Sequence, residues 1–267
     1  MDLSIIIPCY NHGIYIRDAV ASVKLYSGAR QVEIIIVNDG STDDYTKAVL
    51  QELSNEGCRV IHQENKGLGA ARNTGIRNAT GRYILPLDSD NKIYSDYIDK
   101  SIAVLDATPT IGVVYGDAMY FGGKAGRWIV GDFEIRKLFD FNFIDACAVY
   151  RKQIWEELGG YDENMPAMGS EDWEFWMRVA MRGWQFYYIP EVLFEYRVRG
   201  DSMVHQDTKP NYDKIVEYIF SKPEYRLAKD YRATFMELDK YHSVTYSWKA
   251  LQKGLINKLF FSSYRTK

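Results

Sequence analysis

Short apolar runs alternate with amphipathic segments along the first part of the chain. The apolar runs are short and bounded by turn residues, as in buried strands, and cover residues 3–8, 32–37, 59–62, 82–87 and 111–115. The segments between them have helical spacing and cover residues 14–26, 41–54, 67–78 and 95–107. Ser41 or Thr42, and Ser95, can cap two of these helices. This alternation predicts a parallel sheet with right-handed crossovers.

The second half of the chain has a less regular pattern. A hairpin is predicted over residues 119–130, around Gly122 and Gly123. A helix follows over 171–182, and two short strands over 186–189 and 193–197. From about residue 207 the pattern becomes helical and polar, which predicts a helical C-terminal extension over 207–267.

Composition bears on the size of the domain, on nucleic-acid binding and on the cellular compartment. The 267 residues are 46% apolar, enough for one large α/β domain with a small appendage. A net charge of −3 gives no field that would attract nucleic acid. The three cysteines are scattered without metal-ligand spacing, as expected of reduced cytoplasmic thiols. With no signal peptide and no apolar run of ~18 residues, we expect a cytoplasmic protein.

Acidic residues stand at the ends of predicted elements. Asp88-Ser89-Asp90 follows the strand at 82–87, Asp39 ends the second strand, and Glu171-Asp172 opens a helix. Ligands of parallel α/β sheets bind beyond the carboxyl ends of the strands. Two carboxylates one residue apart can converge on one divalent cation that keeps positions open for phosphate oxygens. The sequence therefore predicts a site for a metal and a diphosphate.

Five segments in order carry a family resemblance, namely Ile6-Ile7-Pro8-Cys9-Tyr10-Asn11, Val37-Asn38-Asp39-Gly40-Ser41-Thr42-Asp43, Asn65-Lys66-Gly67-Leu68-Gly69-Ala70-Ala71-Arg72-Asn73, Leu87-Asp88-Ser89-Asp90 and Glu171-Asp172. With them the chain resembles family 2 of the inverting glycosyltransferases over residues 1–206. The resemblance implies the GT-A fold, with a Rossmann-like, mostly parallel central sheet flanked by helices. Residues 1–116 would then bind the nucleotide-sugar and residues 117–206 the acceptor.

The resemblance also implies the reaction. A sugar passes from a nucleotide-sugar, with a UDP-sugar as the expected donor, to a hydroxyl of a glycan or lipid-linked acceptor in cell-surface polysaccharide or glycoconjugate synthesis. Tyr10 would lie against the base, unless it only packs at a strand end, and Asp39 would accept the uracil N3–H, unless it caps the next helix. Arg72 would face base or phosphate, or form a surface salt bridge. The implied donor-binding residues are Pro8, Tyr10, Asn11, Asp39, Gly67, Arg72, Asp88 and Ser89.

The resemblance assigns the chemistry to a further set of residues. Asp90 would ligate Mn²⁺ or Mg²⁺, with Asp88 contacting the metal or the ribose and His205 completing the site. Asp172 would be the base that takes the proton of the acceptor hydroxyl, and the adjacent Glu171 could do the same work. Both acids could instead only stabilise the helix dipole. Trp173 and Trp176 would line the acceptor pocket, or belong to the core.

Two other classes remain open at this point. One is a non-catalytic module that binds a nucleotide-sugar. The other is a phosphatase with an Asp-x-Asp nucleophile, which needs its pair after the first strand and a Thr or Val two residues beyond it. Here the pair follows the fourth strand, and Lys92 takes that position.

The C-terminal tail, residues 240–267, has six basic residues and no acidic one. Its apolar residues Trp248, Leu251, Leu255 and Leu259 recur at helical spacing. Such a helix either lies on an anionic membrane surface, which would place the protein at the inner face of the membrane, or packs on the catalytic domain or on the second subunit of a homodimer.

Overall fold

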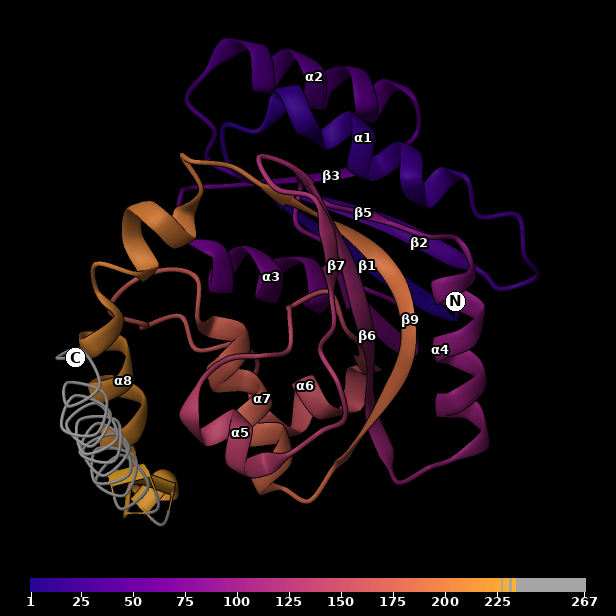
Figure 1. The fold of residues 1–267 in the computed structure, drawn as a ribbon. Coiled ribbons are helices and arrows are strands. Elements are labelled where there is room, and N and C mark those ends of the chain that lie inside the picture. Colours follow the sequence, from indigo (N-terminus) through magenta and orange to yellow (C-terminus); the bar gives the residue numbers. More distant parts are fainter. Residues whose placement is uncertain (227, 231, 234–267) are drawn as a thin grey trace, which may run out of the picture. The chain divides into compact units, whose positions relative to one another are not determined.

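A computed structural model of the chain describes residues 1–226, 228–230 and 232–233 (Figure 1). Residues 1–218 form one compact unit, and a second unit begins at Ile219. The sheet and all the candidate site residues belong to the first unit. The predicted domain divisions after residues 116 and 206 stay predictions.

Within the described residues, nine strands form one sheet in the order β3-β2-β1-β4-β8-β6-β9-β5, with β7 paired to β6. Their bounds are β1 (Leu3–Cys9), β2 (Val32–Asp39), β3 (Arg59–Gln63), β4 (Tyr83–Pro86), β5 (Lys92–Ile93), β6 (Ile111–Gly122), β7 (Gly126–Trp128), β8 (Val149–Arg151) and β9 (Gln185–Val198). Strands β1 to β4 are parallel, as predicted. Strand β8 runs antiparallel between β4 and β6, and β9 pairs with β6 in parallel. The architecture is that of the GT-A fold.

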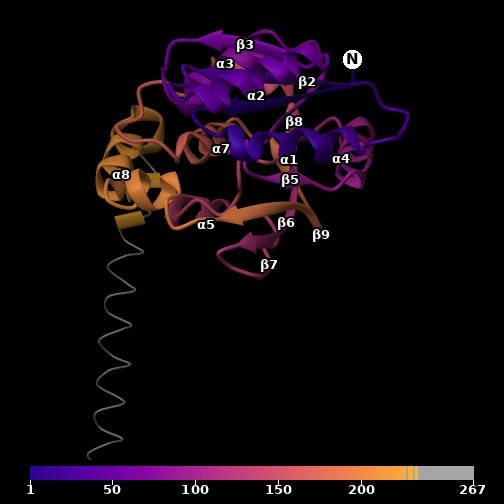
Figure 2. The same cartoon turned by 90° about the horizontal axis from the view of Figure 1, so that it is seen from above.

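Helices cover the sheet, with bounds α1 (Gly13–Lys24), α2 (Asp44–Asn55), α3 (Leu68–Arg77), α4 (Asp96–Ala107), α5 (Ile135–Asp140), α6 (Lys152–Leu158), α7 (Glu171–Met181) and α8 (Tyr212–Ser221). Helices α1 and α2 lie on one side of β1 and β2, and α3 lies on the other (Figures 1 and 2). The strands are added toward one edge of the sheet from β1 to β3, and β4 is then added on the other side of β1. Because each crossover is right-handed, this reversal places α3 on the opposite face from α1 and α2. All seven residues of β1 are buried between these layers, which explains its continuous apolar run.

Three details of the predicted elements are wrong. Helix α2 is capped by Asp43, whose Oδ1 accepts the Thr46 N–H at 2.7 Å, and not by Ser41 or Thr42. Ser95 precedes α4, but its side chain makes no cap hydrogen bond. The two short strands predicted between residues 186 and 197 are one strand, β9, whose pairing with β6 shifts register midway. The predicted hairpin is confirmed as β6–β7.

After β9 the chain forms a π-helix at Val204–Thr208 and then α8. His205 stands in this π-helix, and its side chain lies outside the described part of the structure. The tail at 240–267, with its predicted amphipathic helix, also lies outside the described residues. Among the helices that are described, none is long and apolar enough to cross a membrane.

Candidate active site

A cavity of about 800 Å³ opens beyond the carboxyl ends of β1, β2 and β4. Its walls are completed by the loop at 141–146, the start of α7 and the segment that follows β9. Most of the predicted site residues line it, namely Pro8, Tyr10, Asn11, Asp39, Arg72, Asp88, Ser89, Asp90, Glu171, Asp172 and Trp173. Gly67 and Trp176 are not among the lining residues.

Tyr10 lines this cavity, and the residue is 44% exposed. The next residue, Asn11, has a φ of 54°, in the left-handed region that Asn tolerates better than most residues. Asn11 Oδ1 accepts the Thr42 N–H at 2.8 Å and the Asp43 N–H at 3.2 Å. Asn11 therefore fixes the turn after β2 beside Tyr10 and leaves that ring open to a ligand.

The Asp39 carboxylate is buried and organises the loop before α3. Its Oδ1 accepts the Lys66 N–H at 2.9 Å and a hydrogen bond from Gln63 Nε2 at 2.7 Å. Its Oδ2 accepts the Gly67 N–H at 2.9 Å, and Gly67 has a φ of 88° that favours glycine. Asp39 does not cap α2, because Asp43 does so. Gly67 therefore shapes the wall behind the cavity, while Asp39 lines the cavity itself.

Arg72 and Asp88 form an ion pair at the base of the cavity. Arg72 Nη2 donates to Asp88 Oδ1 at 2.8 Å, and the Arg72 side chain is only 3% exposed. Arg72 is buried and Asp88 is partly exposed, so this is not the surface salt bridge that the sequence left open. Burial acts to lower the pKa of Arg72, but the charge of Asp88, with Asp172 and Glu171, raises it overall. In the free chain Arg72 thus remains charged and holds Asp88 in place.

Asp90 pairs with a second arginine that the sequence did not indicate. Arg199 Nε donates to Asp90 Oδ2 at 3.0 Å, and its Nη2 lies 3.1 Å from His12 Nε2. His12 Nδ1 lies 2.7 Å from Ser89 Oγ. Burial lowers the pKa of His12, which suits a neutral ring that accepts from Arg199 and donates to Ser89. Burial and the charge of Asp88 raise the pKa of Asp90.

The donor set of Asp88 and Asp90 suits a hard cation. Both carboxylates lie on one short turn, and their mutual repulsion is what a divalent cation would relieve. Within the described residues there is no group of three or more acidic, His or Cys side chains arranged to hold a metal. The two aspartates could therefore supply protein ligands, with phosphate oxygens or water for the rest.

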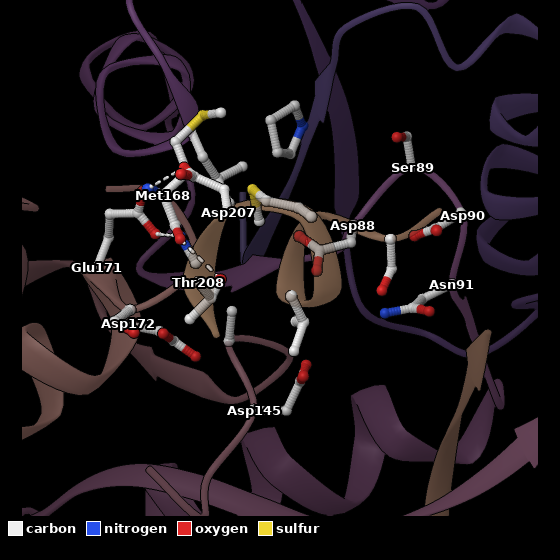
Figure 3. Close-up of a pocket in the computed structure, with 18 of the residues that line it drawn as sticks. Asp88, Ser89, Asp90, Asn91, Asp145, Met168, Glu171, Asp172, Asp207 and Thr208 are labelled. Atoms are coloured by element: carbon white, nitrogen blue, oxygen red, sulfur yellow. Dashed lines mark hydrogen bonds between the residues drawn. The ribbon is translucent and has the colours of Figure 1, made fainter. Parts of the chain in front are cut away.

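Glu171 and Asp172 begin α7 on another wall of the cavity (Figure 3). Asp172 Oδ2 accepts from Asn142 Nδ2 at 3.0 Å, whereas Glu171 Oε2 accepts the Gly169 N–H at 2.9 Å. Burial raises the pKa of both carboxyl groups. A raised pKa is typical of a general base that works near neutral pH. Asp172 is thus bonded to the loop at 141–146 and Glu171 to the segment before α7.

The two predicted acceptor tryptophans have different positions. Trp173 lies at the cavity wall but is fully buried, where its Nε1 donates to the Leu138 carbonyl at 2.6 Å and its ring stacks on Tyr212. Trp176 lies in the core against the rings of Tyr150, Phe175 and Phe186, and this part of the prediction does not fit its position. Residues only three positions apart on α7 thus contact different surroundings, the cavity wall at Trp173 and the core at Trp176.

Sequence reasoning missed several residues that line the cavity, namely His12, Trp128, Phe141, Asp145, Arg199 and Asp207. Two hydrogen bonds to Met168 hold the segment after β9 next to the start of α7. Thr208 Oγ1 donates to the Met168 carbonyl at 2.8 Å, and Asp207 Oδ2 accepts the Met168 N–H at 2.8 Å. No sequence motif marked these residues, because most of them lie on loops, with Trp128 at the end of the short strand β7 and Asp207 in the π-helix.

The chain belongs to family 2 of the glycosyltransferases, as comparison with known sequences shows. The sequence model described as "Glycosyl transferase family 2" matches residues 4–159, and a related one, "Glycosyltransferase like family 2", matches 132–247. Family membership argues against the phosphatase, whereas an assay of sugar transfer distinguishes an enzyme from a non-catalytic module.

Two streptococcal relatives are similar to this chain. Glycosyltransferase GlyA of Streptococcus pneumoniae is 30% identical over 75% of this chain, which spans 31% of GlyA. Glycosyltransferase GlyG of the same organism is 27% identical over 82% of this chain and 78% of its own length. This chain thus spans about a third of the longer relative.

Two solved structures have the same fold. S. aureus TarS residues 1–349, in complex with UDP-GlcNAc, superposes with a TM-score of 0.67 at 18% identity, covering 88% of this chain and 72% of that one. The mannosyltransferase PcManGT of Pyrobaculum calidifontis, in complex with GDP-Man and Mn²⁺, gives 0.62 at 18% identity, covering 96% and 80%. Both are glycosyltransferases of the GT-A fold.

Proposed function

We propose that the chain transfers a sugar from a UDP-sugar to a hydroxyl of a glycan or lipid-linked acceptor, with inversion and with a divalent cation. The observation that carries this proposal is the placement of Asp172, Asp88 and Asp90 around one cavity (Figure 3). A buried base thus faces the residues suited to hold the leaving diphosphate. The complexes of TarS with UDP-GlcNAc and of PcManGT with Mn²⁺ support this choice of ligands.

The donor would enter along the carboxyl ends of the strands. The exposed ring of Tyr10 offers a face on which a base can stack, worth about 1–3 kcal/mol. Asp39 lines the cavity beside it and provides a carboxylate for the uracil N3–H. Asp88 and Asp90 would hold Mn²⁺ or Mg²⁺, which when bound offsets the negative charge of the diphosphate. His205 stays a predicted third ligand.

Asp172 would act on the acceptor. Its carboxylate takes the proton of the attacking hydroxyl while the bond from the sugar to the diphosphate breaks, so the anomeric configuration inverts. Asn142 holds one Asp172 oxygen and thereby fixes the orientation of the base. Glu171 is turned toward Gly169 and serves to shape the preceding loop.

Nucleotide release from a panel of UDP-, GDP- and dTDP-sugars, with Mn²⁺ or with chelator, tests the proposal. We expect release from a UDP-sugar that needs the metal, with a product of inverted anomeric configuration by NMR. Asp172→Asn should lower turnover by about 10²–10⁴, and the matched variant Glu171→Gln should keep most of it. Release from none of the donors would overturn the proposal, and the reverse order of the two variants would reassign the base.

A further inference from the structure

Asp145 is an acidic residue of the cavity to which the reaction above gives no task. It lies on the loop at 141–146 and lines the cavity. Its Oδ1 accepts the Cys147 N–H at 2.9 Å. Among the described residues no other group hydrogen-bonds to this carboxyl group, and no Lys or Arg forms a salt bridge with it. The second oxygen is thus available to a ligand in the cavity.

The three carboxyl groups proposed to carry the reaction each have a side-chain partner. Asp88 is held by Arg72, Asp90 by Arg199, and Asp172 by Asn142. On the same loop, the Oδ1 atom of Asn142 is buried without a partner in the described part of the chain, whereas Asp145 is partly exposed. Buried polar groups of native proteins are nearly always hydrogen-bonded. The loop at 141–146 therefore has an unused hydrogen-bond acceptor that a bound molecule can satisfy.

The position of Asp145 indicates which part of a bound donor it faces. Burial, and then the charges of Asp88 and Asp172, raise the pKa of Asp145 to about 8. Asp145 therefore lies close enough to both aspartates to feel their charge, and Figure 3 shows the three side chains around one space. In the proposed reaction Asp88 is at the diphosphate and Asp172 at the attacking hydroxyl. The group between them is the sugar that is transferred.

We propose that Asp145 determines donor specificity by forming a hydrogen bond with a hydroxyl group of the transferred sugar. This inference rests on the proposed function and names the part of the donor that Asp145 recognises. A hydroxyl group both donates and accepts, so it satisfies either protonation state of the carboxyl group. A site built to hydrogen-bond a substrate hydroxyl discriminates strongly against an analogue that lacks it, because the buried partner is then left unpaired.

Calorimetry with UDP and with the preferred UDP-sugar, both in Mn²⁺, tests the inference. Asp145→Ala should leave UDP affinity within about two-fold and lower UDP-sugar affinity by about 10-fold, as expected for one lost hydrogen bond of this kind. Asp145→Asn keeps hydrogen-bonding capacity and should recover part of the loss. Asp90→Ala is the matched control on the diphosphate side, and it should lower the affinity for UDP itself.

Deoxy derivatives of the sugar extend the test to single hydroxyl groups. The derivative that lacks the recognised hydroxyl should bind wild type and Asp145→Ala equally. Equal losses of UDP and UDP-sugar affinity in Asp145→Ala, or no loss at all, would overturn the inference. Failure of the proposed function looks different, because the wild-type chain would then release nucleotide from no sugar donor.

Discussion

The ion pair between Arg72 and Asp88 predicts an unequal effect of removing its two members. The Arg72 side chain is 3% exposed and that of Asp88 is 30% exposed. Asp88→Ala leaves a buried guanidinium without its main partner, whereas Arg72→Met leaves a carboxylate that water can reach. We therefore expect Asp88→Ala to destabilise the free chain more than Arg72→Met does.

The size of the effect follows from the burial of Arg72. Removing one member of a buried ion pair costs about 3–5 kcal/mol. Arg72 keeps the attraction of Asp172 and Glu171, so the lower end, about 3 kcal/mol, applies here. Its Nε is already buried without a partner among the described residues, which adds no further loss. For a chain of this size about 3 kcal/mol lowers Tm by roughly 6–12 °C.

Thermal and urea denaturation without metal or nucleotide measure this prediction. Arg72→Met should lower the free energy of unfolding less than Asp88→Ala does. The double variant Arg72→Met/Asp88→Ala should be more stable than Asp88→Ala alone, because it no longer buries an unpaired charge. Additive effects in the double variant, or a larger loss in Arg72→Met, would refute the reasoning from burial.

Three further predictions follow. Asp90→Ala should abolish the difference in UDP affinity with and without Mn²⁺, and equal affinities in the wild-type chain would contradict the metal site. The raised pKa of Asp172 predicts that turnover falls as pH drops through that pKa, and a flat pH–rate profile would argue against a carboxylate base. Liposome flotation tests the tail, because a full-length chain that binds anionic vesicles no better than one ending at Asp239 rules out membrane attachment.

A pH dependence of stability follows from Asp145. Its pKa rises from 3.8 to about 8 on folding, so the folded state binds the proton more tightly than the unfolded chain does. This contribution to stability is fully present below 3.8 and is lost as pH rises toward about 8. Urea denaturation over this range should show a weaker decline in Asp145→Asn than in the wild-type chain. An identical decline in both would contradict the raised pKa of this carboxyl group.

The sequence predicts the sheet and the edge on which the cavity opens. Buried parallel strands read as continuous apolar runs, and polar residues at their carboxyl ends have to meet at one edge. This reasoning brought Asp39 and Asp88 to the cavity they line. It divided β9 wrongly, because the strand continues through Pro190, where its pairing with β6 shifts register. A proline is tolerated at such an irregularity.

The partners of the site residues could not be predicted from the sequence. Arg199 and His12 are 187 positions apart, and only the closure of the fold brings them together. Asp145 lies on a loop without periodic pattern, so no spacing rule indicates its direction. Trp173 and Trp176 differ by less than one helical turn, and sequence spacing alone does not tell which of them faces the cavity.

The two arginines explain how two carboxylates can stand one residue apart in a chain without metal. Arg72 compensates Asp88 and Arg199 compensates Asp90, so the turn carries little net charge. A divalent cation that enters alone would add to the positive charge of both arginines. A diphosphate that enters alone would meet two carboxylates. Together their charges nearly cancel, so the two ligands suit this site better in combination than either of them does alone. We therefore expect metal and nucleotide to strengthen each other's binding by the same factor, as linkage requires.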